Sequence, residues 1–204
     1  MNRYIEEFLN LKCAPDVLAT CSPVNNIGKE ITEAMAICRR MRGVILKEPM
    51  NYGLYDLCAG NALTSVISVH LHPIKWAVAI DKKKRDRRWD LSRRFVYRKR
   101  NINDERIFCD DMSDTPFIVV AVHACRGLAE RVIDLYKADE FARHLFLIPC
   151  CDGPEKNRVP YVIRKKIGGY LSWCWHLNDL CGGRLIIDRH IMSSRNAIII
   201  ASKS

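Results

Sequence analysis

The sequence predicts an α/β protein built on a mostly parallel, seven-stranded sheet that ends in an antiparallel pair of strands. From residue 54 onward, short apolar runs alternate with amphipathic stretches of helical length, the pattern of a parallel sheet covered on both faces. The last two runs are separated only by 189-RHIMSSRN-196, which is too short for a crossover helix, so these strands should be antiparallel. The predicted strands are 54–58, 76–80, 105–109, 117–123, 145–150, 184–188 and 197–202.

Residues 1–49 are expected to form a helical N-terminal extension, and residues 50–204 the sheet domain. The segment 3-RYIEEFLNLK-12 predicts one helix, and a turn-rich link that contains Pro15 and Pro23 follows it. The segment 27–46 predicts a second helix, whose apolar face should pack on the edge of the sheet or cover a ligand cleft. Within the sheet domain, helices are predicted at 61–72, near 85–96, at 127–144 and at 163–180, with a short turn after Asp111.

The composition is that of an ordinary globular protein, since 49% of the 204 residues are hydrophobic and 27% are charged. The N-terminus MNRYIEEFLN carries acids where a signal peptide needs a basic start, and no apolar run is long enough to cross a bilayer. We therefore expect a cytoplasmic protein that has no membrane partner. Because several of the ten cysteines lie inside apolar runs such as LFLIPCC, we expect reduced thiols. No pattern in the sequence indicates an oligomeric state.

The cysteine spacing predicts no metal site. No C-x-x-C pair occurs, which removes the commonest spacing of zinc and iron-sulfur ligands. The nearest set is Cys174, His176 and Cys181 in 174-CWHLNDLC-181. On a helix the two cysteines share a face while the histidine points elsewhere, so we expect ordinary packing.

Most of the positive charge is concentrated in one segment. The chain has a net charge of +10, and residues 82–100 contain eleven basic and two acidic residues. Such a segment predicts binding of a polyanion, and the alternative is a solvated charged face. Trp89, Phe95 and Tyr97 lie among these charges and either stack on bases or fix the segment to the core. The residues expected to bind nucleic acid are Lys83, Lys84, Arg87, Arg88, Arg93 and Arg94.

The stretch 55-YDLCAGNALTS-65 is the first candidate for a ligand site. In an open parallel sheet, ligands bind beyond the carboxyl ends of the strands, and the small residues after Asp56 fall at that edge. Gly60 would let the backbone approach a ligand, and the helix that follows offers unpaired N–H groups. The G-x-G-x-x-G and G-x-x-x-x-G-K-[ST] loops are absent, and a tight structural turn is the alternative.

Acidic residues end three successive predicted strands. Asp56 ends the first and Asp81 the second, while Asp110 and Asp111 follow the third. An acid after the second strand is well placed to accept hydrogen bonds from a ribose diol. Asp110 or Asp111 could then meet an adenine amino group. The alternative for each aspartate is a surface or helix-capping role.

This arrangement resembles the class I S-adenosylmethionine-dependent methyltransferases over residues 50–204. Their first motif is an acid followed by alternating glycines, and D-L-C-A-G-N-A keeps Asp56 and Gly60 with small Cys58 and Ala62 in the flanking glycine places. The resemblance implies a Rossmann-like sheet and S-adenosylmethionine as cofactor. The residues that it assigns to the cofactor are Asp56, Cys58, Gly60, Asn61, Asp81, Lys82, Asp110, Asp111 and His123.

Three later motifs resemble a narrower subfamily, that of the Trm13-type tRNA ribose methylases. They are 123-HACRGLAE-130, with an H-x-C turn, 148-IPCCDG-153, with a Cys-Cys pair, and the terminal 191-IMSSRNAIIIASK-203. The chain departs from this pattern at Arg126, which precedes Gly127, and at Asp152, which stands where histidines are often found.

Methyl transfer needs an aligned nucleophile and control of its proton, and the residues at the strand ends offer candidates. His123 is the candidate base because a histidine exchanges protons near neutral pH, and the alternative is a buried, hydrogen-bonded side chain. Cys125, Cys150 and Cys151 are candidate nucleophiles toward a base, and the alternative is that they pack as small hydrophobes. We expect a methyltransferase that acts on RNA, either tRNA or rRNA. The rivals are a small-molecule or protein methyltransferase of the same fold and a noncatalytic cofactor-binding module.

Overall fold

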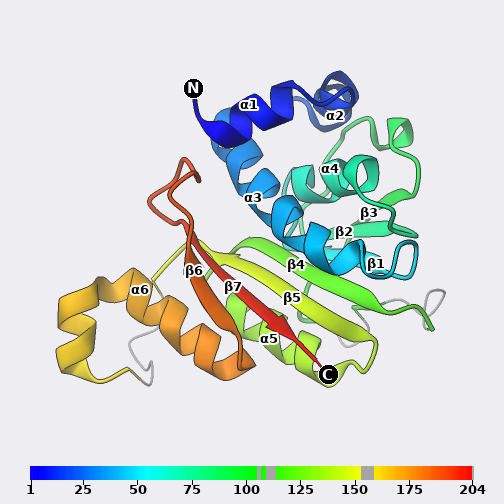
Figure 1. Cartoon of the computed structure of the whole chain (residues 1–204). Coiled ribbons are helices and arrows are strands. Elements are labelled where there is room, and N and C mark those ends of the chain that lie inside the picture. The colour runs from blue at the N-terminus through cyan, green and yellow to red at the C-terminus, as the bar shows by residue number, and fades with distance from the viewer. Residues whose placement is uncertain (105–106, 109–113, 153–158, 204) are drawn as a thin grey trace.

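The protein folds around one seven-stranded sheet, as predicted. A computed structural model describes residues 1–104, 107–108, 114–152 and 159–203. The strand order is β3-β2-β1-β4-β5-β7-β6 (Figure 1). Strands β3, β2, β1, β4 and β5 run parallel, and β7 is antiparallel to both β5 and β6. The strands are β1 (Gly53–Leu57), β2 (Ala77–Asp81), β3 (Phe95–Lys99), β4 (Phe117–Ala124), β5 (Ala142–Pro149), β6 (Arg184–Ile187) and β7 (Ala197–Ser202).

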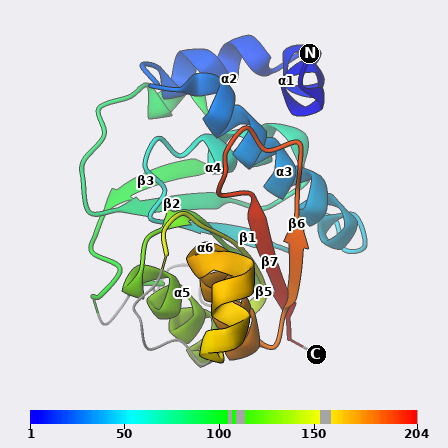
Figure 2. The same cartoon turned by 90° about the vertical axis from the view of Figure 1, so that its left-hand side faces the viewer.

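Helices cover both faces of the sheet (Figure 2). One hydrophobic cluster joins the first four helices to alternate strand residues such as Leu54 and Ala79, and a second joins the last two helices to Tyr55 and Val78. This division follows from the alternation of side chains along each strand. Within the described residues, no helix is both long and apolar enough to span a membrane. The helices are α1 (Arg3–Leu9), α2 (Ala14–Cys21), α3 (Ile27–Ile45), α4 (Leu63–Leu71), α5 (Gly127–Ala138) and α6 (Tyr161–Cys181).

The third strand is not the predicted one. Strand β3 lies at 95–99 and pairs in parallel with β2, in a region where the sequence predicted a helix near 85–96. That region holds only the single 3-10 turn η1 (Trp89–Leu91). Of the predicted strand 105–109, Ile107 and Phe108 are not in a strand and the rest lies outside the described residues. The sequence pattern did not predict β3 because this strand contains charged residues. An edge strand tolerates such residues, since fewer of its positions are buried.

The N-terminal helices share their core with the sheet. Helix α2 begins within the predicted link, with Pro15 in its first turn, where a missing N–H costs nothing. Phe8 of α1 and Met41 of α3 are fully buried in the cluster that also contains sheet residues. Tyr4 and Arg40 both bind the buried carboxylate of Asp188 after β6, at 2.6 and 2.7 Å. These contacts fix α3 over the carboxyl ends of the strands.

Candidate functional site

The turn after β1 keeps the backbone shape of a glycine-rich loop with only one glycine. Cys58, Gly60 and Ala62 have φ values of 58°, 54° and 54°. A left-handed conformation costs a non-glycine residue roughly 1–2 kcal/mol, and strain of this kind is typical of ligand sites. A Cβ atom at Gly60 would meet no heavy atom within 4 Å. The alternate small residues therefore produce a tight turn that leaves open space beside its backbone.

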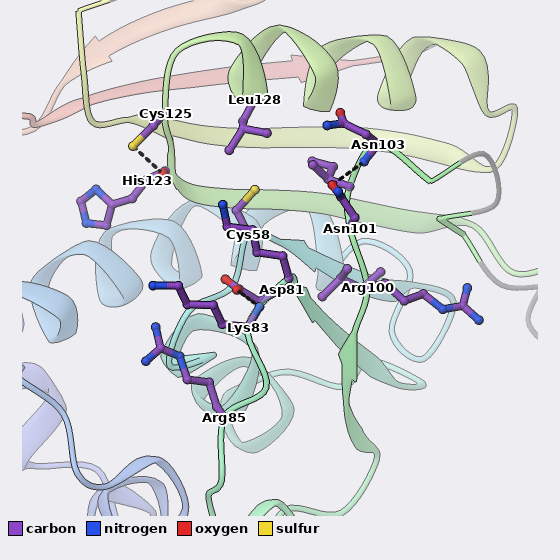
Figure 3. Close-up of a pocket in the computed structure, with 13 residues that line it drawn as sticks. Cys58, Asp81, Lys83, Arg85, Arg100, Asn101, Asn103, His123, Cys125 and Leu128 are labelled. Atoms are coloured by element: carbon purple, nitrogen blue, oxygen red, sulfur yellow. Dashed lines mark hydrogen bonds between the residues drawn. The ribbon is translucent and has the colours of Figure 1, made fainter.

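Asp81 links this turn to the end of β2. Its Oδ1 atom accepts a hydrogen bond from the Lys83 N–H at 2.8 Å (Figure 3), and its Oδ2 atom accepts one from the Gly60 N–H at 2.9 Å. Each carboxylate oxygen has two lone pairs, so each can accept another hydrogen bond. The carboxylate is therefore fixed in position and can still bind a hydroxyl group.

A cavity of about 520 Å³ opens at this edge of the sheet (Figure 3). Its lining comes from the ends of β1, β2 and β4, from the segment after β3 and from the start of α5. Among the lining residues that the structure describes, Asp81 is the single acid, and lysines and arginines outnumber it. The polar lining includes Cys58, Asp81, Lys82, Lys83, Arg85, Arg100 and His123. Four of the predicted cofactor residues, Cys58, Asp81, Lys82 and His123, line this cavity.

The other predicted cofactor residues occupy different positions. Asp56 is 1% exposed and does not line the cavity, because its side chain is turned toward α4, where Ser65 Oγ donates to it at 2.8 Å. Burial raises the pKa of Asp56 to about 7. Asn61 donates to the Glu30 carboxylate at 3.0 and 3.2 Å instead of facing this cavity. Asp110 and Asp111 lie outside the described residues, so among the described acids the expected convergence holds for Asp81 alone.

His123 forms a pair with a buried acid that the sequence reasoning missed. His123 Nε2 lies 2.7 Å from Glu33 Oε2, and Glu33, on α3, is 0% exposed. A carboxylate only accepts hydrogen bonds, so in the neutral imidazole tautomer that donates from Nε2 to Glu33, the Nδ1 atom keeps a lone pair. His123 itself has a φ of 68°, which marks a strained backbone at the end of β4. The signal in the sequence was an acid within the apolar face of a predicted helix.

A second, smaller cavity of about 290 Å³ shares His123 and Arg85 with the first. Its wall is polar and comes from the N-terminal part of the chain and the β1 turn, with Asn25, Asn26, Lys29, Glu30, Asn61 and Arg87. Burial raises the pKa of Glu30, and the hydrogen bond from Asn61 opposes that rise. His123 therefore stands between two cavities of different size.

Three cysteines gather beside His123. Cys125 and Cys150 form a disulfide, and the Cys151 Sγ atom lies 3.3 Å from that of Cys150 and 3.4 Å from that of Cys125. The expectation of reduced thiols is therefore wrong for this pair, because the neighbouring ends of β4 and β5 bring together sulfurs that are 25 residues apart. Only Cys125 among the three lines the larger cavity. The other described cysteines are free.

The basic segment divides into two groups of side chains. The Arg87 guanidinium donates to the carbonyls of Cys21 and Pro23 at 3.0 and 2.8 Å, and that of Arg94 donates to the carbonyls of Val69 and Ile74. These two arginines hold the segment against α2 and α4. Arg94 is exposed as a residue although its guanidinium is engaged, and the exposed members of the predicted set outside these two arginines are Lys83, Lys84, Arg88 and Arg93.

The aromatic residues of the segment pack on one another. The rings of Trp89 and Tyr97 stack with centroids 4.9 Å apart, and Trp89 also lies against Phe95. Trp89 Nε1 donates to the Arg85 carbonyl at 3.1 Å. The sequence left open whether these rings stack on bases or fix the segment to the core, and these contacts show that they fix the segment.

The set at the end of α6 packs in the way that the spacing predicted. Cys174 is fully buried, and His176 Nε2 lies 3.2 Å from Glu130 Oε1 on α5. In the described part of the chain, the one group of three clustered metal-ligand side chains is Cys125, Cys150 and Cys151.

Comparison with known proteins gives both a family and a fold. A family model described as a methyltransferase domain matches residues 28–154. The fold is similar to that of CurJ carbon methyltransferase, with a TM-score of 0.55 and 11% identity over 85% of this chain and 54% of that chain. The chain therefore spans about half the length of that structure. At this identity the likeness extends to the fold alone.

Two further solved structures cover most of both chains. The precorrin-6y C5,15-methyltransferase of Geobacter metallireducens GS-15 is 19% identical, with 86% of this chain and 88% of that chain covered and a TM-score of 0.48. The N-methyltransferase NodS of Bradyrhizobium japonicum WM9 is 13% identical, with 87% and 97% covered and a TM-score of 0.49. No curated protein matches the chain in sequence.

Proposed function

The chain belongs to the family of methyltransferase domains, and we propose that it transfers a methyl group from S-adenosylmethionine to a nucleotide of tRNA or rRNA. The observation that carries the proposal is the position of His123 at the junction of two cavities. A donor in the larger cavity and an acceptor group in the smaller one would meet beside this side chain. Its partner Glu33 belongs to α3, within the segment that the family match covers.

The larger cavity suits a nucleoside-containing donor in size and chemistry. Its volume of about 520 Å³ lies within the range of small-molecule sites, roughly 300–1,000 Å³. The Asp81 carboxylate retains lone pairs for the hydroxyl groups of a ribose. The open space beside Gly60 leaves room for the donor, and we propose that Cys58 and Lys82 contact it there. An adenine contact by Asp110 or Asp111 stays a prediction.

The chain's own chemical task is to align the acceptor and to take its proton. The bound sulfonium supplies an electrophilic methyl group, so no further activation of the donor is required. When Glu33 accepts a hydrogen bond from the Nε2–H of neutral His123, the Nδ1 lone pair is available to remove a proton from an acceptor hydroxyl or amine. Glu33 then stabilises the positive charge that forms on the ring, as a carboxylate does in other acid-histidine pairs.

The proposal of RNA as acceptor is supported by charge. Lys83, Lys84, Arg88 and Arg93 are exposed on the segment that adjoins the larger cavity, and such a concentration of cations attracts phosphates at long range. A small molecule or a protein is the rival acceptor. The narrower resemblance to the Trm13-type enzymes and the cytoplasmic location both stay predictions.

One experiment tests donor and acceptor together. Calorimetry with S-adenosylmethionine is followed by transfer of a tritiated methyl group to fractionated cellular RNA, with wild-type protein and His123→Ala. We expect both proteins to bind the donor and only the wild type to label RNA. If the wild type fails to bind the donor, the proposed function is wrong. Binding with no transfer to RNA would favour a noncatalytic module or a different acceptor.

A further inference from the structure

Three sulfur atoms converge at the ends of two neighbouring parallel strands. The Sγ atoms of Cys125, after β4, and of Cys150 and Cys151, after β5, all lie within 4.8 Å of one another. All three residues are half-buried. A disulfide between Cys125 and Cys150 uses two of these sulfurs and gives no reason for the third, which contacts both. Three mutually accessible thiols suit a metal ion.

We propose that Cys125, Cys150 and Cys151, when reduced, bind one Zn²⁺ ion and leave its fourth coordination position open. In tetrahedral zinc sites the Zn–S distance is about 2.3 Å, which places the sulfurs about 3.8 Å apart. The two distances from Cys151, 3.3 and 3.4 Å, are close to this separation, so small side-chain rotations complete the site. An iron-sulfur cluster fits less well because each cysteine then binds a different iron and the sulfurs lie farther apart. Three protein ligands with one open position are typical of zinc sites that take water or another ligand.

Zinc binding requires that the Cys125–Cys150 disulfide is first reduced by an added reductant. A phosphine and one water molecule react with the Cys125–Cys150 disulfide: the phosphine takes the oxygen of the water and becomes a phosphine oxide, and the two hydrogens of the water leave two thiols in the protein. Binding of Zn²⁺ then releases one proton from each of the three thiols. The product carries one net negative charge, and Arg126 lies directly next in the chain to Cys125.

The backbone around Cys125 supports a role in holding the turn that carries His123. His123 and Arg126 flank Cys125 and have φ values of 68° and 51°, which are costly for residues other than glycine. The sulfurs of Cys125 and Cys150 also lie 3.4 and 3.5 Å from the His123 carbonyl oxygen. An ion that joins β4 to β5 here would stabilise this strained turn. The site does not depend on the proposed methyl transfer, because its ligands are defined by their own geometry.

Zinc binding is tested on the whole chain after reduction with a phosphine and removal of metal by a chelator. After Zn²⁺ is added to this protein and the unbound ion is removed, we expect elemental analysis to give one Zn²⁺ per chain. Replacement by Co²⁺ should give the thiolate-to-cobalt absorption of a three-sulfur site. Cys151→Ser should weaken zinc binding at least tenfold, whereas Cys13→Ser, which changes a half-buried cysteine outside the cluster, should bind zinc as the wild type does.

Alkylation of the wild type, read by mass spectrometry, keeps the test decisive if a variant does not fold. Zinc should protect Cys125, Cys150 and Cys151 from the reagent and leave the reactivity of Cys13 unchanged. The proposal is overturned if the reduced protein binds no zinc, if zinc protects none of the three cysteines, or if Cys151→Ser binds zinc as tightly as the wild type. The last result would leave the cluster as a disulfide beside an exchangeable thiol.

Discussion

His123 Nε2 at the end of β4 lies 2.7 Å from Glu33 Oε2 on α3, and the Glu33 side chain is almost fully buried. The two residues are 90 positions apart in the sequence. The contact joins the N-terminal helices to the sheet at the point where the two cavities meet. It also crosses the predicted boundary at residue 49, so the proposed site draws on both sides of that boundary.

Replacement of Glu33 by Gln should lower kcat and leave donor binding intact. An amide has a similar shape, but it no longer fixes the proton on Nε2 and it stabilises the imidazolium poorly, so a loss of about 10²-fold or more is expected. The KM for RNA should change little because Glu33 does not reach the surface. Methyl transfer measured against RNA concentration separates the two constants.

The matched control for this change is Glu6→Gln, which alters an exposed acid on α1. It should leave kcat unchanged. An equal fall of kcat in both variants, or a Glu33→Gln protein that is altered only in KM, would contradict the positioning role.

Replacement of Asp81 by Asn should weaken S-adenosylmethionine binding about tenfold or more. The carboxylate is fixed by the N–H groups of Gly60 and Lys83, and its remaining lone pairs are the proposed acceptors for the ribose hydroxyls. Calorimetry measures the dissociation constant directly. Asp90→Asn removes one charge from an exposed position of the same basic segment and should bind the donor as the wild type does. Equal affinities in all three proteins would remove Asp81 from the donor site.

The fold was predictable to the extent that strands are apolar. Six of the seven strands were predicted within a few residues because buried strands produce continuous apolar runs. Strand β3 was missed because two of the five residues of its sequence FVYRK are charged, and only its pairing with β2 identifies it. A local sequence pattern does not identify a strand such as β3, which is stabilised mainly by pairing with one neighbouring strand.

The site was predictable where a residue follows a strand and not where packing decides its partner. Asp81 and His123 were found because strand ends determine their place. Glu33 and the contact of Cys125 with Cys150 and Cys151 depend on how distant elements pack, which spacing does not show. Arg87 and Arg94 were assigned to nucleic acid by charge alone, whereas their guanidinium groups bind backbone carbonyls.

Asp56 makes the stability of the protein depend on pH. Burial raises its folded-state pKa from an ordinary value of 3.8 to about 7, so the folded protein binds this proton more tightly than the unfolded chain. The resulting stabilisation is complete at pH values below the unfolded-state pKa of Asp56, and it is lost as the pH rises through the folded-state pKa of about 7. Asp56→Asn keeps an acceptor for Ser65 Oγ without a charge to bury. Relative to the wild type, the variant should therefore gain on the order of 2 kcal/mol between pH 5 and pH 8.

Urea unfolding of both proteins at the two pH values measures this difference. Asp134→Asn, at an exposed position of α5, serves as the control and should follow the wild type at both values. A constant difference between wild type and Asp56→Asn across this range would show that Asp56 does not titrate there.

Charge reversal of the exposed cations should reduce the salt dependence of RNA binding. The variant replaces Lys83, Lys84, Arg88 and Arg93 with Glu and leaves Arg87 and Arg94 in place, because those two hold the segment to the fold. Each phosphate contact on single-stranded RNA contributes about 0.7 to the slope of log K against log salt, so loss of four contacts lowers the slope by about 3. A four-site reversal at Lys47, Lys75, Lys165 and Lys166 changes the net charge equally at exposed positions elsewhere. If the slope falls equally in both variants, the field of the whole protein attracts RNA and the 82–100 segment has no special role. If the slope falls only in the variant of the 82–100 segment, the RNA path runs over that segment toward His123.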